Sequence, residues 1–234
     1  TLGRGGSDTS AVALAAAFHA KLCQIYTDVD GVYTTDPRLV PNARKLDEIT
    51  YDEMLELASQ GAQVLHNRSV ELAKKFRVDL EVLSSLERKP GTKVKEVTKV
   101  EKTNIAGVAK DVSIARIALV GLQHNPGVAF QVFDLLSRNN INVDLILQSI
   151  GREDTKDIAF TIHKKDLEEA ERVLNEHKEA IRFDHIEADE AIGKVSIVGA
   201  GLMSNCGVAA KMFEALYNAG ININMISTSE IKVS

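Results

Sequence analysis

The chain has 234 residues, of which 44% are hydrophobic and 26% charged, and its formal net charge is −5. This composition is that of a globular protein long enough for two or more domains, and it excludes a disordered or fibrous chain. The acidic balance offers no basic surface for nucleic acid, and no apolar run approaches the roughly 20 residues that span a bilayer. We therefore predict no nucleic-acid partner and no membrane partner.

The cysteines and histidines are widely spaced. Cys23 and Cys206 lie far apart in the sequence, and the six histidines form no HxxxH pair. This spacing predicts no metal site built from His and Cys. It fits a reduced, cytoplasmic setting.

The chain opens on a glycine-rich loop, residues 2–8, that runs into an alanine-rich helix expected over Thr9–Ala20, with Ser7 or Asp8 as its cap. Backbone N–H groups at a helix start are unpaired, and the helix dipole makes them attractive to anions. Arg4 adds a planar cation that suits a carboxylate. The alternative is a turn that only caps the helix. Because neither Met nor a strand precedes this loop, we expect the chain to be a piece of a longer protein.

An apolar strand over Cys23–Thr27 leads into an aspartate-rich turn, residues 28–38. A strand that ends in Thr-Asp and is followed by Tyr and Arg suits a nucleotide at the carboxyl edge of an open α/β sheet. The Asp-x-Asp-Gly string lacks the remaining ligands of a calcium loop. An aspartate-rich surface turn is the alternative.

The next elements keep this α/β character. Thr50 to Glu53 matches a capping box and opens a helix that Gly61 ends. A second helix is expected over Ser69–Phe76 and a strand over Leu80–Leu83. Residues 89–103 are charged, contain Pro-Gly, and are predicted to be a linker.

The rest of the chain contains an internal repeat. Residues 117–149 and 195–229 both have a strand–helix–strand pattern, and identical residues recur in register between them. A strand over Ile158–His163 and a helix from Lys165 to about Lys178 separate the copies. Each copy is therefore predicted to follow the ferredoxin-like βαββαβ order, and the second stops near its third strand.

The loop before the helix of each copy carries exposed amides, at 123–127 and 204–207, and polar residues recur on the following strands at 142–148 and 222–228. Such groups facing a helix start suit a small zwitterion. The alternative makes Asn125 and Asn205 plain helix caps and Asn142 and Asn222 plain turn residues, since Asn is a preferred residue in both roles.

Together these motifs resemble those of aspartate kinases. Residues 2–8, 26–38 and 45–66 are similar to the C-terminal half of the amino-acid-kinase domain, and the repeat, with Ser227–Ile231, is similar to tandem ACT domains. The resemblance implies an α/β fold: the C-terminal part of an amino-acid-kinase open sheet, then two ferredoxin-like ACT domains, the second truncated. The expected domains are 1–88 for the partial kinase, 89–103 for the linker, 104–190 for the first ACT domain and 191–234 for the second.

The resemblance implies transfer of the ATP γ-phosphoryl to the side-chain carboxylate of L-aspartate, with Mg²⁺ carried by ATP, as the first step of lysine, threonine and methionine biosynthesis. No catalytic residue is assigned. Position 63 often carries Lys in the family, and here it is Gln. The family's N-terminal lysine-bearing glycine motif is absent, so the chain alone is expected to be inactive. The aspartate-binding residues implied are Arg4, Gly5, Gly6 and Ser7, and the ATP-binding residues are Thr27, Asp28, Tyr33, Asp36, Arg38 and Gln63.

The resemblance further implies feedback by lysine, threonine or both at paired ACT domains, and hence a homodimer or larger assembly. His124 stands where some relatives have an acid, which bears on the effector's identity. The implied effector residues are His124, Asn125, Pro126, Gly127, Val128, Ala129, Asn142, Val143, Asp144 and Gln148 on one wall, and Val208, Ala209, Asn222, Ile223, Ser229 and Glu230 on the other.

Two other functions fit parts of these observations. A non-catalytic, amino-acid-binding regulatory subunit would explain the repeat but would not need the glycine-rich loop. A glutamate or uridylate kinase would explain the first part but not the ACT repeat. A fusion to homoserine dehydrogenase downstream stays open.

Overall fold

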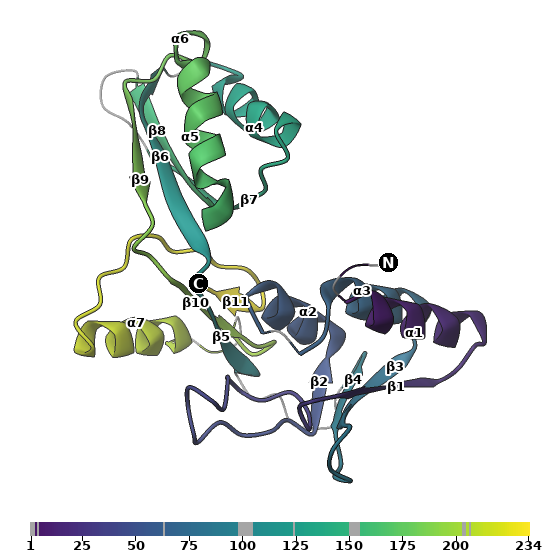
Figure 1. Ribbon diagram of the computed structural model, residues 1–234. Helices are drawn as coiled ribbons and strands as arrows, with labels where there is room; N and C mark the ends of the chain where they lie inside the picture. Colours follow the sequence, from purple (N-terminus) through teal and green to yellow (C-terminus); the bar gives the residue numbers. More distant parts are fainter. Residues whose placement is uncertain are drawn as a thin grey trace. The chain divides into compact units, whose positions relative to one another are not determined.

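The computed structural model describes residues 3, 5–62, 64–97, 105–123, 125–149, 155–202, 205 and 207–234. The chain divides into two compact units, one made of residues 1–110 and 195–234 and the other of residues 111–194 (Figure 1). The second unit is thus inserted into the chain of the first. Among the described residues, no helix combines the length and the apolar character that crossing a membrane requires.

The first unit begins with a four-stranded sheet in the order β1-β3-β4-β2. The pair β1/β3 is parallel, β3/β4 is antiparallel and β2/β4 is parallel. Helices α1 and α3 pack side by side (Figure 1). The elements are α1 (Gly6–Ala17), β1 (Leu22–Thr27), β2 (Glu48–Thr50), α2 (Tyr51–Ser59), α3 (Asn67–Phe76), β3 (Asp79–Ser84) and β4 (Thr92–Lys95).

The predicted linker contains strand β4, so that prediction is corrected. Residues 89–103 were expected to connect domains, but Thr92 and Val94 are fully buried and their strand lies inside the sheet. The alternation of buried and exposed positions in this four-residue strand is too short to stand out in the sequence. In addition, the neighbouring Lys93 and Lys95 make the segment look charged. The kinase-like sheet therefore extends beyond residue 88, the end expected for this part.

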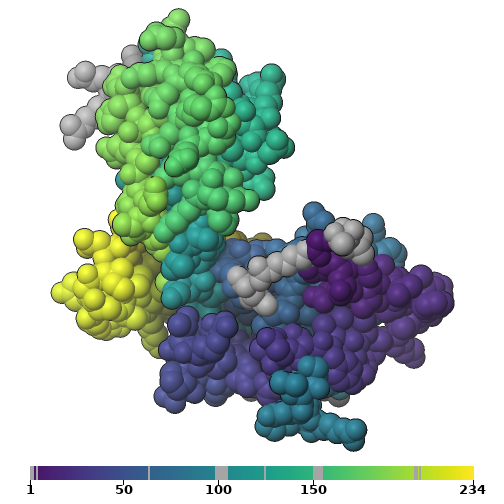
Figure 2. All heavy atoms as spheres, viewed as in Figure 1, coloured from purple at the N-terminus to yellow at the C-terminus, as the bar shows by residue number. Residues whose placement is uncertain are grey.

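The same unit holds a second sheet, ordered β11-β10-β5. Strand β5 (Gly107–Asp111) precedes the inserted unit, whereas β10 (Lys194–Val198), α7 (Val208–Asn218) and β11 (Lys232–Val233) follow it. The second repeat copy thus shares a sheet with a strand from before the first copy. Helix α7 has no buried residue and lies at the surface, in yellow (Figure 2).

The strand predicted after α7 in this second copy does not form. Within the described residues 221–231 the only strand-like pairing is an isolated bridge from Thr228 to Val233. In the second unit the matching strand pairs with a long neighbour, whereas here the neighbour is the two-residue β11. The sequence repeat is therefore stronger than the structural one.

The second unit is a complete βαββαβ fold with the order β7-β8-β6-β9, as predicted for the first repeat copy. Its strand pairs are antiparallel, and α4 and α5 cover one face (Figure 1). Phe133 of α4 meets Phe160 of β8 edge to face, with ring centroids 5.7 Å apart. The elements are β6 (Ile114–Gln123), α4 (Val128–Arg138), β7 (Val143–Gln148), β8 (Thr155–His163), a 3-10 turn (Lys164–Asp166), α5 (Leu167–Glu176), α6 (Lys178–Ile181) and β9 (His185–Asp189).

Helix caps show which local predictions hold. The capping box of Thr50 and Glu53 is confirmed at the start of α2. The predicted caps of α1 are wrong, because Gly5 is the N-cap, with φ 73°, and Ser7 lies inside the first turn. Gly127 and Gly207, not the nearby asparagines, cap α4 and α7, with φ 93° and 100°.

Candidate functional site

Two helix N-termini meet in the first unit. Gly5 caps α1 and His66 caps α3, and a Cβ added to Gly5 would lie 2.3 Å from Cγ of His66. Each helix leads back into a strand of the parallel pair β1/β3, so both N-termini face the carboxyl ends of those strands. Their helix dipoles and first-turn N–H groups favour a carboxylate or a phosphate at this point, although the Gly6 and Arg68 N–H groups donate to Gly3 and His66. The predicted residues Gly5, Gly6 and Ser7 are placed here, whereas Arg4 lies outside the described residues.

The carboxyl ends of β1 and β3 are tied together. Thr27 pairs with Ser84 in the parallel register, and both the backbone N–H and the hydroxyl of Ser85 donate to the Thr27 carbonyl, at 2.8 and 2.9 Å. The Thr27 hydroxyl donates to Asp28 at 3.0 Å. Two of the predicted nucleotide residues therefore stand at the edge where an open α/β sheet binds its ligands.

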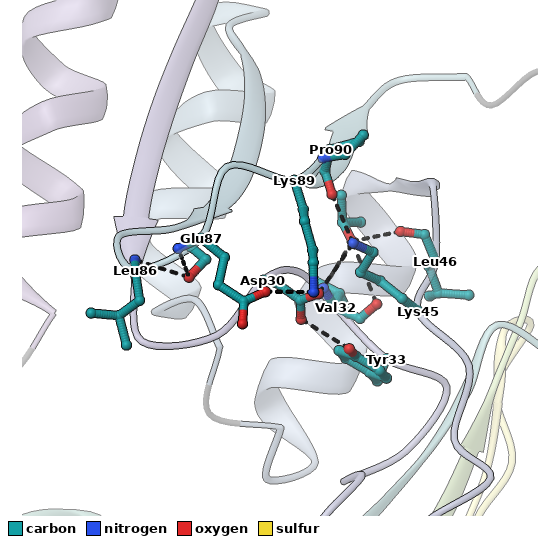
Figure 3. A network of polar contacts seen from close by, with 11 residues as sticks. Asp30, Val32, Tyr33, Lys45, Leu46, Leu86, Glu87, Lys89 and Pro90 are labelled. Carbon is teal, nitrogen blue, oxygen red and sulfur yellow. Dashed lines mark hydrogen bonds and ion pairs between the residues drawn. The ribbon is translucent and has the colours of Figure 1, made fainter.

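A polar network fixes the loop that follows (Figure 3). The Tyr33 hydroxyl donates to Asp30 at 2.9 Å, and Lys45 Nζ donates to Asp30 at 3.2 Å and to the Pro90 carbonyl at 2.7 Å. Partial burial alone would raise the pKa of Asp30, but the hydrogen bonds from Tyr33 and Lys45 outweigh it and lower that pKa. The hydrogen bond that the Tyr33 hydroxyl donates to Asp30 also raises the pKa of Tyr33.

Buried Thr92 anchors the base of this loop. Its hydroxyl accepts from the Val32 N–H at 2.8 Å and donates to the Leu46 carbonyl at 2.5 Å. Gly31 packs so closely that a Cβ would lie 2.5 Å from that hydroxyl oxygen. Sequence reasoning missed both Thr92 and Lys45, because their partners lie many residues away along the chain.

The other two predicted nucleotide residues of this loop form a pair of their own. Arg38 donates to the Asp36 carboxylate from Nη2 at 2.8 Å and from Nε at 3.0 Å, and its backbone N–H donates to the same carboxylate. These hydrogen bonds from Arg38 lower the pKa of Asp36. The guanidinium side chain is 88% exposed, so it is oriented yet open to an anion. The predicted ATP residue Gln63 lies outside the described residues.

The second unit contains a separate pocket of about 320 Å³ beside the start of α4. It brings together most of the first predicted effector wall. Lys156 is a lining residue that sequence reasoning missed; it pairs with Leu122 across β6 and β8. His124 lies outside the described residues. The lining residues are Leu122, Gln123, Asn125, Pro126, Gly127, Val128, Ala129, Gln148, Lys156 and Ile158.

Three residues of that predicted wall are not lining residues of this pocket. Val143 and Asp144 begin β7 and Asn142 directly precedes it, whereas Gln148 ends the strand, so the strand's length separates them. Asp144 instead forms an ion pair with Lys194, whose side chain is almost fully buried. This pocket therefore brings 125–129 together with Gln148 but not with 142–144, and a wall that includes 142–144 stays a prediction.

The second predicted effector wall is spread over three segments of the first unit. Val208 and Ala209 begin α7, Asn222 and Ile223 are exposed on the extended chain after it, and the Ser229 N–H donates to the Lys232 carbonyl at 2.8 Å. Glu230 is exposed in the turn before β11. Among the described residues, no three His, Cys, Asp or Glu side chains are placed to hold a metal ion. Cys23 is free and buried, and burial raises the pKa of its thiol.

Family models match both parts of this architecture. The amino acid kinase family matches residues 1–84, and the ACT domain matches residues 117–177 and 195–234. The fold and site thus define an amino-acid-kinase segment joined to ACT repeats. The chain is 52% identical, over its whole length, to the aspartate kinase of Pseudomonas putida KT2440 and to aspartokinase 2 of Bacillus subtilis 168, and it spans 57% of each. The chain belongs to the aspartate kinase family.

Solved structures agree with this assignment. Escherichia coli aspartokinase III in complex with aspartate and ADP is 33% identical, with a TM-score of 0.83 over the whole chain and 52% of that protein. The Clostridium acetobutylicum aspartate kinase gives 28% identity and a TM-score of 0.87, with 55% of that protein covered. The regulatory subunit of aspartate kinase from Thermus thermophilus is 39% identical, with a TM-score of 0.53, over 56% of this chain and 86% of the subunit.

Proposed function

We propose that the full-length protein that carries this chain is an aspartate kinase, which transfers the γ-phosphoryl group of ATP to the side-chain carboxylate of L-aspartate. The observation that carries this proposal is the meeting of the α1 and α3 N-termini beside the carboxyl ends of β1 and β3. The reactants are an amino-acid dicarboxylate and a polyphosphate. A site with two helix N-termini offers stabilisation to both kinds of anion.

In this proposal the chain contributes positioning and charge neutralisation. The start of α1, residues 4–7, holds aspartate, while Thr27, Asp28, Tyr33, Asp36, Arg38 and Gln63 hold ATP. A carboxylate oxygen of aspartate attacks the γ-phosphorus, the bond to the bridging oxygen breaks, and ADP leaves with 4-phospho-L-aspartate as the product. In this proposal a Mg²⁺ ion accompanies the ATP phosphates and neutralises part of their charge.

The test is aspartate-dependent formation of ADP by the full-length protein, with glutamate as the competing substrate. Ser7→Ala is expected to raise the KM for aspartate about tenfold, because it removes one donor to a charged group. Ser10→Ala is the matched control, since the Ser10 hydroxyl donates to the Gly6 carbonyl within the same helix. ATP turnover that does not depend on aspartate would contradict the proposal.

We also infer that the pocket in the second unit binds a small amino-acid effector. The N-terminus of α4 and Lys156 suit its carboxylate, and the amides of Asn125 and Gln148 suit its amine or hydroxyl. The described lining residues include no carboxylate, so this pocket favours threonine over lysine. E. coli aspartokinase III has been solved with lysine and aspartate, which makes lysine the natural competitor.

Calorimetric titration of the full-length protein with threonine, and separately with lysine, tests the pocket. Saturable binding of threonine that Lys156→Ala weakens about tenfold is expected, because a charge-assisted contact is lost. Lys165→Ala is the control, since Lys165 lies in the 3-10 turn after β8 and is not among the pocket's lining residues. Binding of lysine alone would contradict the preference for threonine. Effector control would then depend on other contacts of the expected homodimer.

A non-catalytic regulatory subunit is the second candidate, supported by the similarity to the Thermus thermophilus regulatory subunit. That similarity covers 56% of this chain, whereas residues 1–84 match the amino acid kinase family. A subunit that only bound effectors would have no use for the loop network around Asp30. Calorimetric titration with ADP separates the two, since only the kinase is expected to bind it.

A further inference from the structure

Lys45 joins two loops that are distant in sequence. Its ammonium group contacts the Asp30 carboxylate at 3.2 Å, in the loop after β1, and the Pro90 carbonyl at 2.7 Å, in the loop after β3 (Figure 3). Both side chains of the ion pair are about three-quarters buried, at 24% and 26% exposure. This contact therefore differs from the exposed ion pairs of the molecule, which contribute little.

The neighbouring contacts leave Lys45 little freedom. A backbone bridge pairs Tyr33 with Lys45, and the Leu46 N–H donates to the Val32 carbonyl at 2.8 Å. The stem of Lys45 packs over Gly31, where an added Cβ would lie 3.0 Å from Cδ. Lys45 thus belongs to a short stretch of backbone pairing at the base of the loop, and its ammonium group points toward Asp30.

Asp30 receives both the ammonium and the Tyr33 hydroxyl, the latter at 2.9 Å. Thr27, Asp28, Asp36 and Arg38 stand on the same stretch of chain, residues 27–38. Ser85 holds the start of this stretch to the loop after β3 through the Thr27 carbonyl, and the Lys45 contacts hold the two segments together farther along, at Asp30 and Pro90.

We propose that Lys45 is a positioning residue for the nucleotide: by linking Asp30 to the Pro90 carbonyl it holds the two strand-end loops at the separation that ATP and ADP require. The inference rests on the proposed function, since it assumes that the nucleotide binds at these loops. It assigns Lys45 no contact with the reacting atoms.

The test compares Lys45→Met with wild type in the full-length protein. The KM for ATP and the Kd for ADP are expected to rise about tenfold, because two hydrogen bonds of a charged group are lost, while the KM for aspartate stays within about twofold. Lys45→Arg, which keeps the charge, is expected to recover most of the nucleotide affinity. Lys21→Met, at the exposed position directly before β1, is the control and is expected to change none of the three constants.

A second variant covers the case in which Lys45→Met fails to fold. Asp30→Asn keeps the shape of the acceptor but removes its charge, and it is expected to raise the ADP Kd selectively by a few-fold. An unchanged ADP Kd in the folded variants, or an equal rise in the constants for ATP and aspartate, overturns the proposal, as does a wild type that does not bind ADP. If wild type binds ADP but does not phosphorylate aspartate, the proposed function fails while the ADP titration still decides the role of Lys45.

Discussion

At the scale of single residues, Gly5 is where conformation and contact both exclude a side chain. Its φ is 73°, and an added Cβ would overlap the His66 ring. Gly5→Ala is expected to lower the free energy of unfolding by about 2–3 kcal/mol and to weaken aspartate binding, because the two helix N-termini must separate. Urea unfolding and calorimetric titration with aspartate measure both effects.

Gly3→Ala provides the matched control. Gly3 has φ 71°, but a Cβ there would have no atom within 4 Å. Only the backbone strain applies, so a loss of about 1 kcal/mol is expected. Equal losses at the two glycines would show that the His66 contact is unimportant.

Asp30 gives the residue-scale prediction for pH. Its pKa is lowered in the folded protein, although partial burial acts in the opposite direction, because Tyr33 and Lys45 donate to it. A depressed carboxyl pKa contributes stability that is present above the unfolded value, about 3.9, and is lost as the pH falls through the folded value. The stability difference between wild type and Asp30→Asn is therefore expected at pH 7 and should shrink below about pH 4. Urea titrations from pH 7 to pH 3 check this, and a difference independent of pH would contradict it.

Residue-level prediction from sequence worked where the signal was local. Gly5, Gly6 and Ser7 were assigned to one loop and lie at one helix start. Lys45 and Lys156 were missed, because each is placed by residues distant in sequence: Lys45 by the Pro90 carbonyl and Lys156 by pairing with β6. The family resemblance implied that Asn142–Asp144 share the effector wall; they lie at the opposite end of β7 from Gln148, and their role stays a prediction.

At the scale of elements, Glu53 supports helix α2 through two sets of contacts, one made by each of its carboxylate oxygens. One carboxylate oxygen accepts from the Thr50 backbone and hydroxyl, at 3.2 and 2.9 Å, and the other accepts from the Ala200 N–H at 3.0 Å. Glu53→Ala removes the carboxylate half of the capping box and leaves donors in a largely buried place without their acceptor. The free energy of unfolding is expected to fall by about 2–3 kcal/mol.

Asp52→Ala is the comparison for the same turn of α2. Asp52 pairs with Lys74 at 2.5 Å, but the two side chains are 56% and 40% exposed. An exposed ion pair contributes about 0–1 kcal/mol, so the loss should be smaller than at Glu53. Denaturant unfolding of both variants decides the order, and a larger loss at Asp52 would contradict the role given to Glu53.

Periodicity in the sequence predicted the long elements and missed the short ones. The capping box located α2, and the repeat located β6, α4 and β7, since each has a pattern of its own. Strand β4 has only two buried positions between lysines, too few for a period to emerge. The strand expected within 222–229 shows the converse, because a strand-like sequence forms no strand without a neighbour to pair with.

At the scale of the whole molecule, the chain order differs from the order in the sheets. Strand β5 pairs with β10, and the segment between them is the second unit. No sequence pattern could show this, because pairing of two strands separated by a whole domain is a property of the fold. A linear division at residues 104 and 191 therefore assigns β5 to the first ACT domain, whereas β10, its partner in the sheet, belongs to the second.

The insertion leads to a prediction about independent folding. Residues 111–194 contain all four strands and the helices of the βαββαβ fold, and their buried side chains form one cluster that includes Ile117, Leu136 and Phe160. This piece is expected to fold alone and to unfold cooperatively in urea, because it has a complete core of its own. Residues 195–234 alone are expected to stay unfolded, since β10 would lack β5 and α7 buries no side chain. Circular dichroism of the two pieces measures this, and a folded 195–234 together with an unfolded 111–194 would show that β5 is not the strand that completes the second repeat copy.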